Sequence, residues 1–183
     1  MRIIAGEARG VRLATPEGRD IRPTLDRVRE ACFSIIGPAL PGSRFLDLFS
    51  GTGANGLEAI SRGAAHADLV ESDRTARSLI EQNIVRTKFG DRVRVHALTL
   101  PEGLRRLPHD PPYDFIYADP PHRFEDFAAI LEAVTANTLL ASTGTFILEH
   151  HTCASVPEQV GKMARVRDAV YGKTTLSFFR SAD

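Results

Sequence analysis

The sequence predicts an α/β protein built on a mostly parallel, Rossmann-like sheet. From residue 44 onward, short apolar segments alternate with segments that have helical periodicity. Alternation of this kind places helices on both faces of a parallel sheet. Ligands of such sheets bind beyond the carboxyl ends of the strands. We therefore look for the chemistry of this chain in the residues that directly follow its strands.

The expected elements follow from these patterns in chain order. Strands are expected at residues 45–49, 67–71, 92–96, 113–119 and 144–150, with a closing hairpin formed by residues 164–171 and 174–180 around Gly172. Helices are expected at residues 55–62, 75–89 and 124–137, and a further helix would run from an N-cap at Thr24 to the glycine at 37. Before them, residues 2–5 and 11–14 predict an N-terminal β-hairpin. We assign residues 1–20 to this appendage and residues 21–183 to the sheet domain.

Composition is that of an ordinary globular chain of 183 residues, with 43% hydrophobic and 25% charged residues. No apolar run reaches the length of a membrane span, and the first residues lack the apolar core of a signal peptide. We therefore expect a cytoplasmic protein. Cys32 and Cys153 match no metal-ligand or redox spacing, so two free thiols and no metal site are expected.

Charge is balanced overall, with 23 basic and 23 acidic residues, which argues weakly against nucleic acid as a partner. The distribution is more informative, because the first 29 residues contain seven arginines and four acidic residues. Arginine matches the geometry of phosphate groups and stacks on bases. This segment is either an RNA-contacting surface or a solvated charged face.

A glycine-rich loop follows the first strand of the sheet. Gly51, Gly53 and Gly56 form the pattern G-x-G-x-x-G, and Glu71 ends the next strand, where it could accept hydrogen bonds from a ribose. The pattern alone would fit a dinucleotide, whose pyrophosphate binds at a helix N-terminus. Asp47 in the preceding strand would repel that pyrophosphate but attract the ammonium and sulfonium of S-adenosylmethionine. The loop therefore favours S-adenosylmethionine over a nicotinamide cofactor.

The segment Asp119-Pro120-Pro121-His122 follows the fourth strand. An amino group on a base is a poor nucleophile. Methyl transfer to it therefore needs hydrogen-bond acceptors for the amino protons and alignment of the nitrogen with the methyl donor. The carboxylate of Asp119 and the rigid carbonyl of Pro120 could act as those acceptors. His122 could stack on a base that has left its helix. The sequence thus predicts methylation of an exocyclic amine, although the same segment could merely end a strand.

Several segments together resemble one protein family. RPTLDRVREACFSIIG, DLFSGTGANGLEAISRGA, VESD, IYADPPH and YGKTTLSFF occur in the order typical of the bacterial small-subunit ribosomal RNA guanine N2-methyltransferases. The opening MRIIAGEARGVRL is similar to the N-terminal hairpin of that family. The resemblance covers nearly the whole chain. It implies a seven-stranded methyltransferase sheet whose last strand is antiparallel, and methyl transfer from S-adenosylmethionine to the N2 amine of a guanine in small-subunit rRNA.

The resemblance also implies roles for individual residues. The cofactor site would comprise Thr24, Arg27, Asp47, Phe49, Ser50, Gly51, Gly53, Glu71, Ser72 and Leu98. The catalytic loop would comprise Asp119, Pro120, Pro121 and His122. The RNA-binding residues would be Arg2, Arg9, Arg12, Arg22 and Lys173. We expect a monomer that acts on rRNA, within an assembling or an assembled ribosomal subunit.

Two departures from the family pattern stand out. His122 replaces the aromatic residue that usually follows Asp-Pro-Pro, so base stacking is expected to be weaker. Leu98 lies where many methyltransferases have an acidic residue that binds the adenine amino group. Asn83 is interpreted as a helix-packing or capping residue, and His150 and His151 as solvent-facing residues with no role.

Three alternative functions stay open on the sequence alone. The same chemistry could act on DNA adenine or cytosine, or on a glutamine side chain, because Asp-Pro-Pro loops serve all these amines. The chain could instead be a non-catalytic RNA-binding assembly factor that retains the fold. A nicotinamide-dependent dehydrogenase would fit the glycine pattern but not Asp47.

Overall fold

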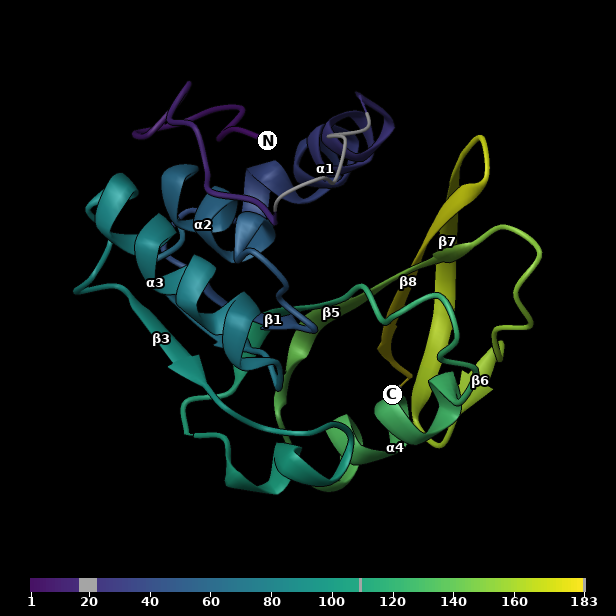
Figure 1. Cartoon of the computed structure of the whole chain (residues 1–183). Coiled ribbons are helices and arrows are strands. Elements are labelled where there is room, and N and C mark those ends of the chain that lie inside the picture. Colours follow the sequence, from purple (N-terminus) through teal and green to yellow (C-terminus); the bar gives the residue numbers. More distant parts are fainter. Residues whose placement is uncertain (17–22, 109, 183) are drawn as a thin grey trace. The chain divides into compact units, whose positions relative to one another are not determined.

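The computed structural model describes residues 1–16, 23–108 and 110–182, and only the backbone of residues 23–25. The chain forms two compact units, Met1–Ala97 and Leu98–Asp183 (Figure 1). Among the described residues, no helix combines the length and apolar character needed to cross a membrane. The predicted boundary at residue 20 falls outside the described residues and stays a prediction.

The first unit contains three parallel strands in the order β3-β2-β1. Their bounds are β1 Arg44–Leu48, β2 His66–Val70 and β3 Val93–His96, and the helices are α1 Pro23–Ile36, η1 Gly37–Ala39, α2 Ala54–Ser61 and α3 Arg74–Thr87. Asp47 and Leu69 are partners in the β1–β2 register and share one face of these strands. The glycines of the loop and of α2 pack against Leu69 and against Ile80 of α3. Both helices therefore cover the face that carries Asp47.

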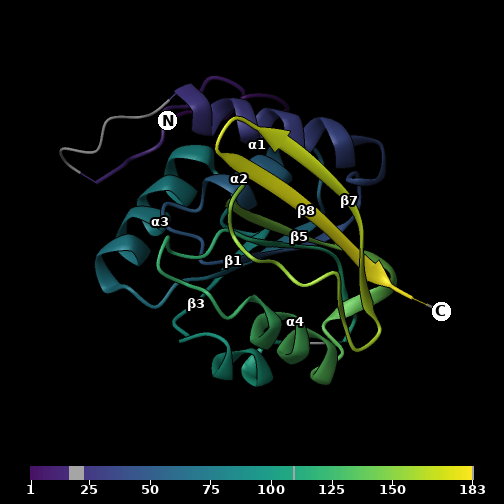
Figure 2. The ribbon, with the colours of Figure 1, turned by 90° about the vertical axis from the view of Figure 1, so that its right-hand side faces the viewer.

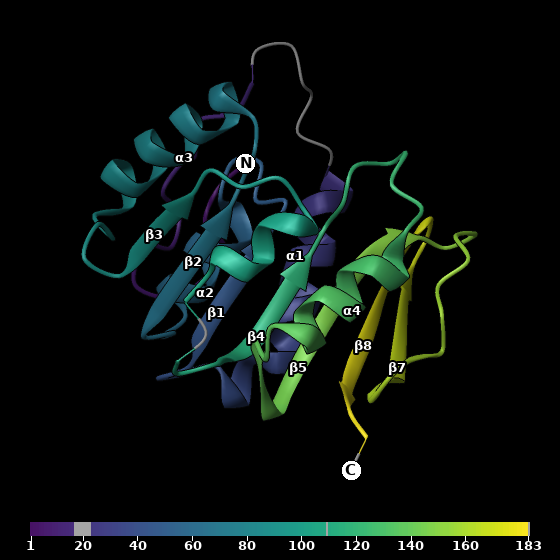
Figure 3. The same cartoon turned by 90° about the horizontal axis from the view of Figure 1, so that it is seen from below.

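The second unit contains five strands in the order β4-β5-β8-β7-β6. Their bounds are β4 Tyr113–Ala118, β5 Leu140–His151, β6 Gln159–Val160, β7 Met163–Tyr171 and β8 Thr174–Ser181, with η2 Glu102–Arg106 and α4 Phe127–Ala136. β4 and β5 are parallel, whereas β8 pairs antiparallel with both β5 and β7. The long strands β5, β8 and β7 lie side by side in Figure 2, and α4 lies against β5 in Figure 3. The antiparallel strand at the end of the chain is thus confirmed.

Most expected elements occur within a few residues of their predicted ends. The two-residue strand β6 and the short helix η2 were not expected, because each is too short to show a period. α1 begins at Pro23, so the predicted N-cap at Thr24 is wrong. Proline suits the first helical position because its fixed φ is helical and its missing N–H is not needed there.

The N-terminal hairpin is less regular than predicted. Its antiparallel pairing reduces to an isolated bridge between Arg2 and Arg12, supported by backbone hydrogen bonds between Ile3 and both Val11 and Gly10. Hydrogen bonds to side chains of α2 also hold the segment. The buried carboxylate of Glu58 accepts hydrogen bonds from the N–H groups of Ile4 and Ala5, at 2.7 and 3.1 Å. A buried carboxylate needs such partners, and here the N-terminal backbone supplies them.

Gly6 lies where the N-terminal segment approaches α2 most closely. A Cβ atom at this position would lie 1.7 Å from the carbonyl oxygen of Ser61, and φ is +82°. Gly6→Ala should therefore displace the segment and lower the free energy of unfolding by about 2–4 kcal/mol. Urea denaturation gives this value, and limited trypsin digestion at the N-terminal arginines reports whether the segment has left α2.

Gly10→Ala is the matched control. Gly10 also has positive φ, +87°, but no atom lies within 4 Å of the position that a Cβ atom would take there. This variant should lose only the conformational preference of glycine, about 1 kcal/mol. Equal losses in the two variants would contradict the idea that close approach to Ser61 requires glycine at position 6.

Candidate active site

The glycine-rich loop of the first unit has an unusual backbone. Phe49, Gly51 and Gly53 all have positive φ, at 61°, 55° and 77°. Ser50 holds this turn in place, because its hydroxyl donates to the carbonyl of Asp47 at 2.7 Å and its N–H donates to the carbonyl of Val70 at 2.9 Å. Positive φ at the non-glycine Phe49 is a strained conformation of the kind that clusters at ligand sites.

Asp47 is completely buried beneath this loop. Its Oδ2 accepts a hydrogen bond from the N–H of Gly56 at 3.0 Å, but its Oδ1 has no hydrogen-bond partner. Burial raises the pKa of Asp47 to about 7, the negative charge of Glu71 adds to this rise, and the Gly56 hydrogen bond opposes it. A buried oxygen without a partner is costly and indicates either strain or a missing ligand. A bound cation would stabilise the ionised carboxylate of Asp47 and give its Oδ1 a partner.

Glu71 lies beside the loop, as the sequence predicted. Its Oε2 accepts from the N–H of Gly51 at 2.8 Å, and its Oε1 accepts from the N–H of Asp73 at 2.8 Å. Each carboxylate oxygen has a second lone pair, so Glu71 could also accept ribose hydroxyls. Ser72 is exposed, and its carbonyl accepts from the guanidinium of Arg77. The structure therefore brings together Asp47, the loop and Glu71.

The structure does not place three of the expected cofactor residues relative to this cluster. Arg27 is exposed on α1. The side chain of Thr24 lies outside the described part of the chain. Leu98 is buried and belongs to the second unit, where a side chain at residue 103 would meet its Cβ. Their cofactor roles stay predictions.

The Asp-Pro-Pro-His segment directly follows β4 in the second unit. Asp119, Pro121 and His122 are exposed, and Pro120 is half-buried. The carbonyl of Pro121 accepts from the N–H of Phe124 at 2.7 Å, which closes a turn after the second proline. The His122 ring lies 6.1 Å from the ring of His151, at the end of β5. The segment is thus a tight, exposed turn that presents a carboxylate and an imidazole.

His150 is not the solvent-facing residue that the sequence suggested. Its ring is half-buried, and its Nε2 lies 2.8 Å from the hydroxyl of Ser177, which in turn donates to Asp168. Burial lowers the pKa of His150, so the neutral ring is favoured at pH 7. His151 is exposed, as expected. The missed signal was the position of His150 on the face of β5 that α4 covers, where its ring lies 6.2 Å from the ring of Phe127.

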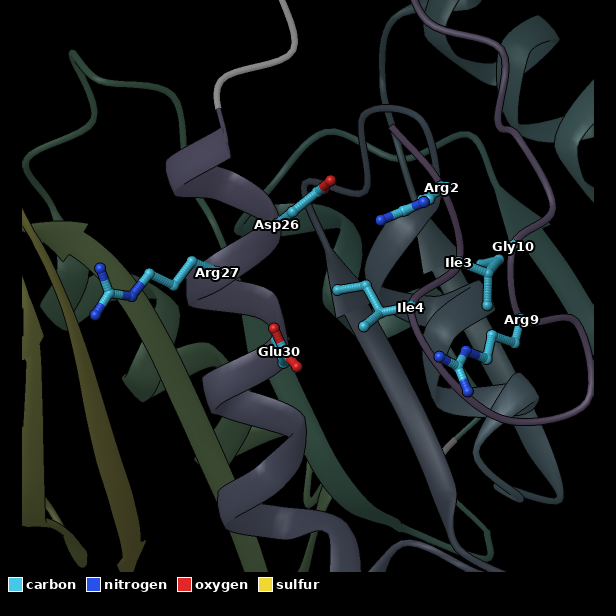
Figure 4. Close-up of a pocket in the computed structure, with 8 residues that line it drawn as sticks. All are labelled: Arg2, Ile3, Ile4, Arg9, Gly10, Asp26, Arg27 and Glu30. Carbon is cyan, nitrogen blue, oxygen red and sulfur yellow. The ribbon is translucent and has the colours of Figure 1, made fainter.

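The N-terminal arginines line part of a pocket of about 400 Å³ beside α1. Figure 4 shows Arg2 and Arg9 extending from the N-terminal segment toward α1, where Asp26 and Glu30 form the opposite wall. Arg29 is buried and holds the two walls together, because its Nη2 donates to the Arg2 carbonyl and to Asp26, each at 2.8 Å. Arg12 and Lys173 are exposed, and Arg22 lies outside the described residues.

Asn83 does more than pack a helix. Its side-chain amide pairs with the backbone of Ala14, accepting at 2.6 Å and donating at 3.1 Å, and it also donates to the carbonyl of Thr52 at 2.9 Å. It is completely buried. Asn83 thus links the N-terminal segment to the glycine-rich loop. The available signal was a polar residue on the buried face of α3, between Ile80 and Thr87.

Comparison with known proteins identifies the family and the relatives that this chain resembles. Residues 1–180 match the model of the Conserved hypothetical protein 95 family. The chain is 30% identical over 180 residues to the ribosomal RNA small subunit methyltransferase D of Escherichia coli K12, covering 98% of this chain and 89% of that one. It is 31% identical over 181 residues to YlbH of Bacillus subtilis, covering 98% of each chain, and YlbH is assigned to the rRNA methyltransferases.

This chain belongs to the Conserved hypothetical protein 95 family. A solved structure of yhhF from Escherichia coli, assigned to the methyltransferases, superposes with a TM-score of 0.86 at 28% identity, covering 100% of this chain and 98% of that one. The expected methyltransferase fold and the resemblance to the small-subunit rRNA methyltransferases are therefore confirmed. The names of these relatives do not give the methylated atom.

Proposed function

We propose that this protein transfers a methyl group from S-adenosylmethionine to the N2 amine of a guanine in small-subunit ribosomal RNA. The observation that carries the proposal is the buried, unpartnered Oδ1 of Asp47 beneath a glycine-rich loop, in a chain whose relatives are named as rRNA methyltransferases. The glycine-rich loop above Asp47 would hold the methyl donor, and the Asp119 segment would bind the acceptor amine.

The residues of the first unit fit this cofactor. Asp47 and Glu71 are two nearby carboxylates, and the negative charge of Glu71 disfavours ionisation of Asp47. S-adenosylmethionine would supply a methyl group on a sulfonium and would bring a second cationic group, its ammonium. Positive charge relieves the repulsion between the two acids. A pyrophosphate would increase it, which argues against the nicotinamide alternative.

The Asp119 segment fits an amine acceptor. The lone pair of the amine would form the new N–C bond as the bond between the methyl group and the sulfonium sulfur breaks, and the nitrogen would then lose a proton to water. A carboxylate at this position accepts an amine hydrogen bond and stabilises the positive charge that develops on the nitrogen. Asp119 and the Pro120 carbonyl would do this, and His122 would stack on the base. Among the described residues, no group of three or more His, Cys, Asp or Glu side chains could hold a metal ion.

RNA as substrate is supported by the N-terminal segment. Arg2 and Arg9 converge on one pocket, and Glu58 and Asn83 tie the same segment to α2 and α3. Arginines held in this way match phosphodiester groups. A non-catalytic assembly factor would also bind RNA, but it would have no use for an unpartnered acid beneath the loop. We expect a cytoplasmic monomer.

The test compares substrates with one enzyme preparation. Labelled S-adenosylmethionine is incubated with naked small-subunit rRNA, with small ribosomal subunits from cells that lack the enzyme, and with duplex DNA. Nucleosides are then separated by mass spectrometry. We expect N2-methylguanosine from one or both rRNA samples and no methylated base from DNA. Methylation of DNA alone would support the alternative amine substrates, and cofactor binding without any product would support the assembly factor.

A further inference from the structure

A second carboxylate lies beside Asp119 in the second unit. Ala118 of β4 and Leu148 of β5 are partners in the parallel register, so the next residues along the two chains are Asp119 and Glu149. Neighbouring strands lie about 4.8 Å apart, and residues at equivalent positions project from the same face. Asp119 and Glu149 therefore occupy adjacent positions where β4 ends.

Tyr117 fixes the position of Glu149. This tyrosine is completely buried, lies two residues before Asp119, and donates a short hydrogen bond from its hydroxyl to Oε2 of Glu149. Side chains two residues apart on a strand share a face, so this contact places Glu149 on the face of Tyr117 and Asp119. An ionised carboxylate can accept about four hydrogen bonds, so the hydrogen bond from Tyr117 uses only part of the accepting capacity of Glu149.

The surroundings of Glu149 suit a flat ligand. His151 follows it by two residues on β5, and its ring lies 6.1 Å from the ring of His122. The N–H of Cys153 donates to Nδ1 of His151 at 3.2 Å, which holds the ring in place. Two exposed imidazoles thus lie near each other within three residues of the two acids along the chain, and such rings can contact the face of a base.

The two neighbouring acids, Asp119 and Glu149, match the hydrogen-bond donors on one edge of guanine. Guanine presents the N1–H and the N2 amine as neighbouring donors, whereas adenine has an unprotonated acceptor at N1 beside its amine. Cytosine likewise has an acceptor beside its amine. A carboxylate attracts the N1–H of guanine and repels a ring nitrogen lone pair. A site that accepts a hydrogen bond from one base discriminates strongly against a base that lacks this donor. This discrimination is much larger than apolar contacts alone can give.

We propose that Glu149 is a specificity-determining residue that accepts the N1–H of guanine while Asp119 accepts from the N2 amine. This inference rests on the proposed function, because it names the base read by the same site. Tyr117 is then a positioning residue that acts through Glu149.

The test uses a base that keeps the reacting amine but lacks the N1–H. The guanine found by mapping is replaced with 2,6-diaminopurine in rRNA rebuilt by splinted ligation, and kcat/KM is compared for the two RNAs. The wild-type enzyme should prefer guanine by about 100-fold or more. In Glu149→Gln, kcat/KM for guanine should fall about 10–100-fold, because a neutral amide replaces the charged acceptor. The preference for guanine should shrink at least about tenfold, because the amide can donate to N1.

Two further variants separate specificity from folding. Glu132→Gln changes an exposed carboxylate on α4 in the same unit and should leave both rates unchanged. Tyr117→Phe removes only the hydroxyl, and it should lower the guanine rate about 3–10-fold while retaining most of the preference.

The outcomes are distinct. If Glu149→Gln slows both RNAs by the same factor, Glu149 only supports Tyr117 and the inference is overturned. If the wild-type enzyme methylates neither RNA nor natural rRNA, the proposed function itself is wrong. A reduced guanine preference in Glu149→Gln, with the Glu132 control unchanged, supports the inference.

Discussion

Asp119→Asn is expected to lower the rate of methyl transfer to small-subunit rRNA by about 10²–10³-fold. Asparagine has nearly the same shape, and its carbonyl can still accept a hydrogen bond from the amine. It carries no charge, however, so the positive charge that develops on the amine nitrogen loses its partner. Single-turnover rates at saturating cofactor and RNA measure this effect. The dissociation constant for S-adenosylmethionine should stay within about threefold of the wild-type value, because the partner that we propose for Asp119 is the amine and not the cofactor.

Glu125→Gln provides the matched control for Asp119→Asn. Glu125 is an exposed carboxylate six residues further along the same chain segment. Its loss changes the charge of the segment without removing the acceptor that we assign to the amine, so single-turnover rates should be unchanged. A wild-type rate in Asp119→Asn would mean that Asp119 only ends β4, as a simple strand terminator would.

Much of the fold could be predicted because its signals are local. Alternating apolar strands and helices produce a parallel sheet, and residues that follow the strands then gather at one edge. That reasoning correctly placed the loop at Gly51 beside Glu71, 20 residues away in the sequence, where the two are joined by a hydrogen bond. It could not show that Glu71 already bonds two backbone N–H groups, because that depends on the turn at residues 71–73.

The contacts of the N-terminal segment could not be predicted from local patterns. Glu58 and Ser61 of α2 and Asn83 of α3 bind its backbone across 53 to 69 residues of sequence. Backbone recognition of this kind leaves no residue pattern in the recognised segment. It explains why an expected hairpin became a segment with one isolated bridge, since its hydrogen-bonding groups are shared with the helices.

Glu149 was missed for a similar reason. A single acid near the end of a strand has no motif, and its significance depends on the register that places it beside Asp119 and within reach of Tyr117. Asp47 shows the opposite case. Its sequence position suggested a cationic cofactor, but only the structure reveals that one carboxylate oxygen is buried without a partner.

Asp47→Asn is expected to stabilise the protein without cofactor and to weaken its cofactor binding. The pKa of Asp47 is about 7 when folded and 3.8 in the unfolded reference, so the folded state binds the proton more tightly. Between pH 4 and 7 the folded state holds more protons than the unfolded state, and stability falls as pH rises through this window. Each pKa unit corresponds to about 1.4 kcal/mol, so the full loss is on the order of a few kcal/mol.

Asparagine removes this penalty because it cannot ionise, and its carbonyl can keep the hydrogen bond from Gly56. The free energies of unfolding of wild type and Asp47→Asn should be similar near pH 4 and should diverge up to pH 7. Above pH 7 the variant should be more stable by about 2–4 kcal/mol. Urea denaturation without cofactor at several pH values gives these differences. Asp91→Asn, which changes an exposed acid of the same unit, should show no such divergence.

Cofactor binding should change in the opposite direction. A cation pairs with ionised Asp47, so binding to the wild type near pH 6.5 should release a proton into the buffer, whereas Asp47→Asn should not show this release. Calorimetry in buffers of different ionisation enthalpy counts these protons, and the amino group of S-adenosylmethionine contributes little because it is already mostly protonated near this pH. Losing the charged partner should weaken binding about 10–100-fold at pH 7.5. Tight binding and equal proton release in the variant would show that Asp47 does not face the cofactor. The stability lost by burying this acid is thus expected to be recovered when a cation binds beside it.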